Sequence, residues 1–205
     1  MFDDLISEGY KLFSSRKLAP NFCSRCAPIR QDFCTIFENN KMTDLSSREM
    51  ALYSSRSVTT MGGLGDYLHF LPRLLECSAL SLFDPNSEWN TNESLLVKKV
   101  EEILEKDLFT ASEREHIYKF FDIRFRIFLT DPDDYRLEHF LSYETSSWEF
   151  RARFLALWLS STEPLAIEKL VNFVTNDVKI YYLKDPRYDE WFKSEPVLQK
   201  IISYI

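Results

Sequence analysis

The feature that most constrains this chain is a glycine cluster that leads directly into an amphipathic helix. Three of the four glycines in the 205 residues fall within positions 62–65. The apolar residues that follow recur at i, i+3, i+4, i+7 and i+8, the spacing of a buried helix face. They are Tyr67, Phe70, Leu71, Leu74 and Leu75. We predict a tight turn and then a core helix around which the remaining helices pack, with Phe70 and Leu74 buried.

A proline stands inside this predicted helix. Pro72 cannot donate a hydrogen bond to the carbonyl of Leu68, and its ring clashes with that carbonyl. The helix is therefore expected to kink. A glycine turn that leads into a kinked helix is costly locally, and such features often occur at functional sites.

Helical periodicity continues along most of the chain, and few glycines interrupt it. Ser46 with Glu49, and Thr110 with Glu113, have the spacing of capping boxes at two helix starts. The segment 178–183 could be helix or strand. The predicted helices cover about residues 2–14, 28–40, 46–56, 66–81, 95–105, 110–128, 131–141, 147–160, 164–173, 188–194 and 197–204.

The predicted fold class is therefore all-α. We expect one all-α domain over residues 1–205, with a sub-boundary at the loop 83–92. From residue 93 onward, short capped turns separate the helices, which suggests antiparallel helix pairs stacked as an irregular α-solenoid.

The charge and the apolar runs limit the possible partners. The net charge of −7 argues against nonspecific binding to nucleic acid or anionic lipid, and it suits a basic protein partner. The longest apolar run, 154–159, is too short to span a bilayer. The N-terminus lacks the basic region and apolar core of a signal peptide, so we expect a cytoplasmic protein with reduced cysteines.

Cys23 and Cys26 form a Cys-x-x-Cys pair. Two thiolates at this spacing can bind one side of a tetrahedral zinc ion, but no second pair completes the site. Cys34, Cys77 and His69 are the only candidates to complete it. A redox role would favour a helix start beside a strand, and no βαβ pattern is present. We expect structural thiols and no cofactor, with zinc on Cys23 and Cys26 as the alternative.

The polar face of the central helix is a second candidate site. Asp66, His69 and Arg73 recur at spacings of three and four, so they share one face. They could form an acid–base cluster, but no nucleophile accompanies them. We expect a solvated polar stripe, with Arg73 buried against Asp66 or against an unpaired carbonyl near Pro72 as the alternative. His116 and His139 stand alone on helices and are expected at the surface or its boundary.

One part of the chain resembles a known group of proteins. The residues concerned are Cys23-x-x-Cys26, Thr60-x-Gly62 and the run Asp66-x-x-x-Phe70-Leu71-Pro72-Arg73-Leu74-Leu75-Glu76. They are similar to a set of uncharacterised bacterial cytosolic proteins with an N-terminal cysteine pair and a Phe-Leu-Pro-Arg helix. The resemblance covers about residues 20–80. It implies a bacterial origin and a shared helical fold, and it implies no activity.

These features together favour a function without catalysis. The prediction is an acidic bacterial binding protein, of the immunity or antitoxin kind, that docks on a protein partner and binds neither nucleic acid nor membrane. The alternative is an enzyme or metal protein that uses the Asp66, His69 and Arg73 face together with the Cys23–Cys26 pair.

Overall fold

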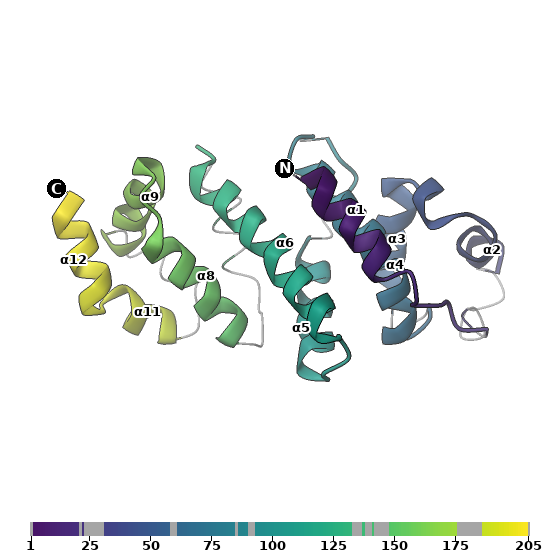
Figure 1. The fold of residues 1–205 in the computed structure, drawn as a ribbon. Coiled ribbons are helices and arrows are strands. Elements are labelled where there is room, and N and C mark those ends of the chain that lie inside the picture. Colours follow the sequence, from purple (N-terminus) through teal and green to yellow (C-terminus); the bar gives the residue numbers. More distant parts are fainter. Residues whose placement is uncertain are drawn as a thin grey trace. The chain divides into compact units, whose positions relative to one another are not determined.

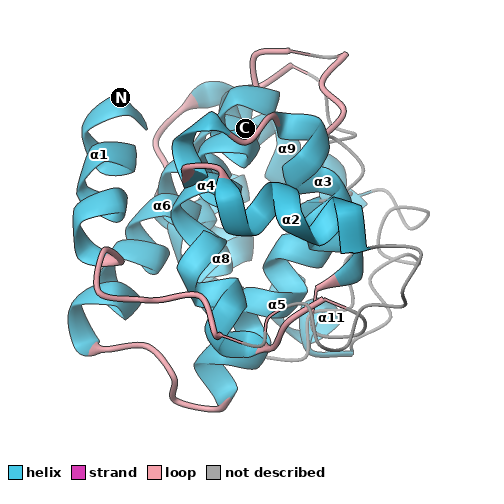
Figure 2. Ribbon diagram, turned by 90° about the vertical axis from the view of Figure 1, so that its right-hand side faces the viewer, coloured by secondary structure: helices cyan, strands magenta, loops and turns pink. Residues whose placement is uncertain are grey.

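The structure is a computed structural model, and it describes residues 2–20, 22, 31–57, 61–84, 86–89, 93–132, 137, 141, 148–175 and 186–204. Over these residues the chain is entirely helical apart from its loops and one isolated bridge between Ser57 and Met61 (Figure 1 and Figure 2). The predicted all-α fold class is confirmed.

The helices fall close to the predicted ranges. The elements are α1 (Phe2–Leu12), α2 (Gln31–Asn39), the 3₁₀ helix η2 (Met42–Asp44), α3 (Ser47–Arg56), α4 (Leu64–Ser81), α5 (Glu93–Glu105), α6 (Ala111–Thr130), α8 (Trp148–Ser160), α9 (Pro164–Thr175), α11 (Pro186–Phe192) and α12 (Glu195–Tyr204). The predicted helix opening at Pro28, most of the predicted helix over 131–141 and the segment 178–183 lie outside the described residues.

The chain divides into two compact units, Met1–Phe120 and Phe121–Ile205, and the division falls inside α6. The expected single domain, the sub-boundary at 83–92 and the solenoid stacking stay predictions.

Helix α4 is the centre of the first unit. It contacts α1, η2 and α3, which precede it in sequence, and α5, which follows it. Twelve of its 18 residues are buried, so most of its surface faces protein. Phe70 is 1% exposed and Leu74 is 0% exposed. The prediction that this helix lies at the core, with Phe70 and Leu74 buried, is confirmed.

An aromatic cluster surrounds Phe70. The ring centroid of Phe70 lies 4.7 Å from that of Tyr53, 5.6 Å from that of Phe37 and 5.9 Å from that of Phe22. These rings come from α3, from α2 and from the segment that follows α1. Because Phe70 contacts all three, α4 holds these segments together by aromatic packing.

Local sequence signals set the helix starts. The Ser46 hydroxyl accepts from the Glu49 amide, and the Glu49 carboxylate accepts from the Ser46 amide, so the first capping box is confirmed. Thr110 and Glu113 make the same reciprocal pair at α6. Helix α4 continues through Pro72, which is buried, and its predicted kink stays a prediction.

The second unit has its own aromatic core. The Trp158 ring lies 5.1 Å from that of Phe173, and its indole N–H donates to the Ala166 carbonyl at 2.8 Å. Lys169 is 1% exposed, and its ammonium group donates to the Phe128 carbonyl at 2.9 Å. Phe128 lies in the last turn of α6, where a cation is favourable.

His116 lies in the interior of the first unit. His116 was expected at the surface or its boundary, and this is wrong, because it is 4% exposed. Its Nε2 lies 2.9 Å from the point where a Cβ on Gly9 would sit, so the missing side chain of Gly9 lets α1 approach α6 closely.

Within the described ranges, no helix has the length and apolar character needed to cross a membrane.

Candidate functional site

Asp66 binds backbone at the start of α4. One carboxylate oxygen accepts from the Gly63 amide at 2.7 Å, and the other accepts from the Ala19 amide at 2.8 Å. The first bond satisfies an otherwise unpaired N–H at the helix start. Gly62 adopts φ +67, and a Cβ there would lie 2.8 Å from the Asp66 carboxylate. The glycine turn is thus explained by the close packing of Asp66.

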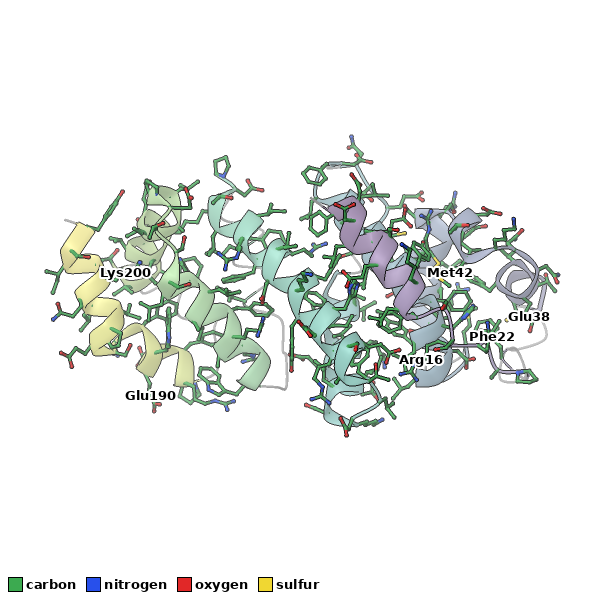
Figure 3. The ribbon with its side chains drawn as sticks, in the orientation of Figure 1. Arg16, Phe22, Glu38, Met42, Glu190 and Lys200 are labelled. Carbon is green, nitrogen blue, oxygen red and sulfur yellow. The ribbon has the colours of Figure 1, made fainter. Side chains whose placement is uncertain are left out.

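His69 also binds backbone, in the segment that follows α1. Its Nδ1 lies 2.8 Å from the Arg16 carbonyl oxygen. A carbonyl can only accept, so Nδ1 carries the proton in this contact. The Arg16 side chain, labelled in Figure 3, forms an ion pair with Glu113 and donates to the Leu108 carbonyl at 2.8 Å. His69 therefore helps to fix a link between α4 and the start of α6.

Arg73 is largely buried and fully engaged. Its side chain is 14% exposed. Nε and one terminal nitrogen donate to the Leu45 carbonyl at 2.8 and 2.6 Å, and the other terminal nitrogen donates to Glu76 at 2.6 Å. The expected solvation of Arg73 is wrong, because Leu45 needs a donor just before α3. Arg73 is buried as in the alternative, but its partners are Leu45 and Glu76, and not Asp66 or a carbonyl near Pro72.

The polar stripe therefore does not form an acid–base cluster. Asp66 and His69 hold the segment that follows α1, whereas Arg73 holds the residue before α3 and Glu76. Asp66 and Arg73 bind backbone or a structural ion pair through their polar atoms, and His69 binds backbone through Nδ1. The arrangement stabilises the fold, and the catalytic alternative at this face stays a prediction.

The cysteine pair Cys23 and Cys26 lies outside the described residues. Cys34 and Cys77 are buried, and burial raises the pKa of the Cys77 thiol. Among the residues that the structure describes, no three or more His, Cys, Asp or Glu side chains are grouped to hold a metal. The prediction of no cofactor, with zinc on Cys23 and Cys26 as its alternative, stays a prediction.

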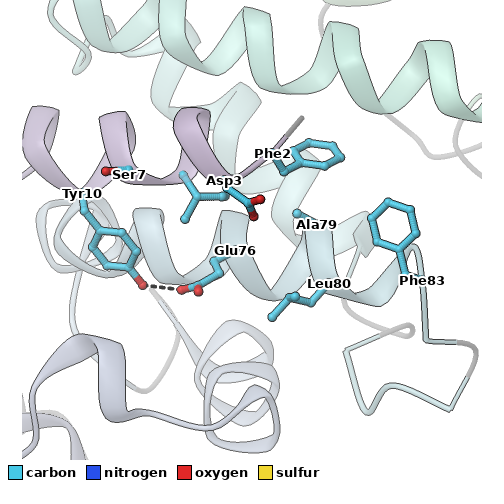
Figure 4. Close-up of a pocket in the computed structure, with 9 residues that line it drawn as sticks. Phe2, Asp3, Ser7, Tyr10, Glu76, Ala79, Leu80 and Phe83 are labelled. Carbon is cyan, nitrogen blue, oxygen red and sulfur yellow. Dashed lines mark hydrogen bonds between the residues drawn. The ribbon is translucent and has the colours of Figure 1, made fainter.

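The polar stripe ends at a groove between α1 and α4. This groove has a volume of about 480 Å³. Figure 4 shows Tyr10 beside Glu76 at one end of it and Phe2 near Phe83 at the other. The volume lies within the range of about 300–1,000 Å³ that is typical of binding pockets. The lining residues are Phe2, Asp3, Ile6, Ser7, Tyr10, Glu76, Ala79, Leu80 and Phe83.

Hydrogen bonds to Glu76 hold the polar end of the groove. One oxygen of Glu76, Oε2, accepts from the Tyr10 hydroxyl at 2.6 Å and from Arg73 at 2.6 Å. Burial and the neighbouring Glu76 carboxylate raise the pKa of Tyr10, which keeps the phenol protonated as a donor. The Glu76 side chain is still 27% exposed, so its carboxylate can be reached from the groove.

The apolar end of the groove is open to solvent. Phe83 is 72% exposed and Leu80 is 54% exposed, while Phe2 and Ala79 are buried beneath them. Neighbouring exposed apolar side chains beside a concave surface are a common mark of an interaction site. This groove is the best candidate functional site in the first unit.

Sequence reasoning missed the groove, although part of its signal was present. Phe83 was assigned to a loop, and Glu76 was not named as a site residue. Tyr10 of α1 and Glu76 of α4 lie 66 positions apart in the sequence. The pairing of these two helices therefore could not be predicted from either helix alone. No protein-family model, curated protein or solved structure matches this chain, so the site rests on its own geometry.

Proposed function

We propose that this chain is a non-enzymatic binding protein, of the immunity or antitoxin kind, and that it docks a protein partner in the α1–α4 groove. The observation that carries the proposal is the exposure of Leu80 and Phe83 beside a concave surface. Burying such side chains against a partner removes apolar area from water and favours association.

The charge of the chain supports a basic partner. The net charge is −7, and the groove is lined by the carboxylates of Asp3 and Glu76. An acidic surface attracts a basic protein and raises its association rate. The bacterial origin and cytoplasmic location that the sequence predicts are compatible with this function.

The enzyme alternative is less well supported. A catalytic group must be free to reach a reacting atom, and Asp66 and Arg73 already use their polar atoms on the fold. The zinc content of the purified protein tests the alternative of a metal centre at Cys23 and Cys26.

Photo-crosslinking tests the proposed function. A benzoyl-phenylalanine at Phe83, in an extract of the organism that encodes the chain, should form a crosslink to one defined protein. The same group at Lys98, exposed on α5, is the matched control and should not. Leu80→Asp should suppress the crosslink from position 83. Equal products from both positions, or a product that Leu80→Asp does not affect, would argue against docking in the groove.

A further inference from the structure

We infer that the occupant of the α1–α4 groove is a basic amphipathic helix of the partner. The inference rests on the proposed function and specifies which kind of segment the groove accepts. It is carried by the spacing of the lining residues and by their charge.

The two walls of the groove have the same helical spacing. On α1 the lining residues Asp3, Ile6 and Tyr10 stand at i, i+3 and i+7, and Ser7 lies next to Ile6. On the α4 side Glu76, Ala79 and Phe83 stand at i, i+3 and i+7, and Leu80 lies next to Ala79.

The two walls run antiparallel. In Figure 4, Tyr10 lies opposite Glu76 and Phe2 lies near Phe83, so the chain directions are opposed. Two parallel rows at this spacing form the surface into which a third helix packs its own side chains. Each row covers two turns, or about 10 Å of helix axis.

The charge along the groove selects the sign of the occupant. The nine described lining residues include two carboxylates, Asp3 and Glu76, and no lysine or arginine. The hydrogen bonds from Tyr10 and Arg73 both go to Glu76 Oε2, so Oε1 accepts no hydrogen bond from the described residues. A carboxylate has room for further donors, and a lysine or arginine of the occupant supplies them.

The two ends of the groove set where the partner helix must carry apolar residues and where it must carry a basic residue. Apolar anchors on its face would lie against Leu80 and Phe83, and a cation about one to two turns away would reach Glu76. A second acidic residue, Asp3, lies exposed on α1 between these ends. An acidic helix would bury Asp3 beside like charge, which is costly, whereas Glu76 already has Arg73 as a partner.

Calorimetric titration with two synthetic helical peptides tests the inference. Both peptides carry the same leucine stripe, and their flanks carry lysine in one and glutamate in the other. The lysine peptide should bind with one-to-one stoichiometry, and salt should weaken the binding. The glutamate peptide should bind at least about tenfold more weakly, which corresponds to about 1.4 kcal/mol.

Substitutions of groove residues test whether the peptides bind in the groove. Asp3→Asn and Glu76→Gln should each weaken the lysine peptide several-fold, and Leu80→Ser should weaken both peptides. Asp3 and Leu80 are exposed, so these two variants keep the test valid even if Glu76→Gln disturbs the fold. Glu105→Gln, exposed on α5, is the matched control and should change nothing.

The outcomes separate the two proposals. Equal binding of both peptides, or binding that ignores Asp3→Asn and Leu80→Ser, would overturn the basic helix as occupant. If neither peptide binds but the crosslink from position 83 persists, the inference fails and the proposed function stands. If the crosslink is absent as well, both fail.

Discussion

Replacing Arg73 with alanine should be among the most damaging changes in the first unit. The guanidinium makes two short bonds to the Leu45 carbonyl and one to Glu76, and its side chain is 14% exposed. A hydrogen bond from a charged donor contributes about 1.5–3 kcal/mol, and a buried acceptor left without a donor costs about 1–3 kcal/mol. The partly exposed pair with Glu76 adds at most about 1 kcal/mol. We expect the free energy of unfolding to fall by about 3 kcal/mol.

Urea unfolding followed by far-UV circular dichroism measures this change, and tryptophan fluorescence checks that the transition is two-state. Arg48→Ala is the matched control, because Arg48 is 81% exposed and lies 4.0 Å from Glu88, so it should cost less than about 0.5 kcal/mol. Arg73→Lys should fall between the two, since an ammonium cannot reproduce the planar fork. A loss below about 1 kcal/mol for Arg73→Ala would refute the buried network.

Three further predictions concern the core, a buried histidine and the cysteine pair. Phe70→Ala and Leu74→Ala should each lower the free energy of unfolding by about 2–5 kcal/mol, and a mild effect in urea unfolding would show that α4 is peripheral. Burial lowers the pKa of His116. The nearby charge of Glu8 opposes this shift, and Lys119 lowers the pKa further by a smaller amount. The unfolded chain therefore takes up the proton more readily, and the melting temperature should fall as pH drops below about 6.5, less so in His116→Gln. An equal fall in both proteins would remove His116 as the cause. Elemental analysis of protein purified without added zinc should find well under one equivalent, and a stoichiometric content lost in Cys23→Ser would promote the metal-protein alternative.

The sequence supports conclusions where neighbours along the chain decide the structure. The apolar spacing from Tyr67 to Leu75 predicted the buried face of α4, and Ser46 with Glu49 predicted a helix start that the structure contains. In these cases the interacting residues lie within one or two helical turns of each other, so their spacing carries the signal.

Longer-range contacts could not be predicted in this way. Arg73 meets the Leu45 carbonyl 28 residues away, and Asp66 meets the Ala19 amide 47 residues away. These partners are set by how α1 and α3 pack on α4, which no local pattern encodes. For the same reason the polar stripe was expected in solvent, and the α1–α4 groove was not foreseen.

The most direct test of the central claim is to map the binding of the lysine peptide on ¹⁵N-labelled protein by chemical-shift perturbation. The account predicts that the largest shifts fall on the two walls of the groove, at Asp3, Ser7, Glu76, Leu80 and Phe83, with little change along the outer face of α5. Shifts that cluster on any other surface, or that spread evenly over the protein, would contradict the α1–α4 groove as the binding site.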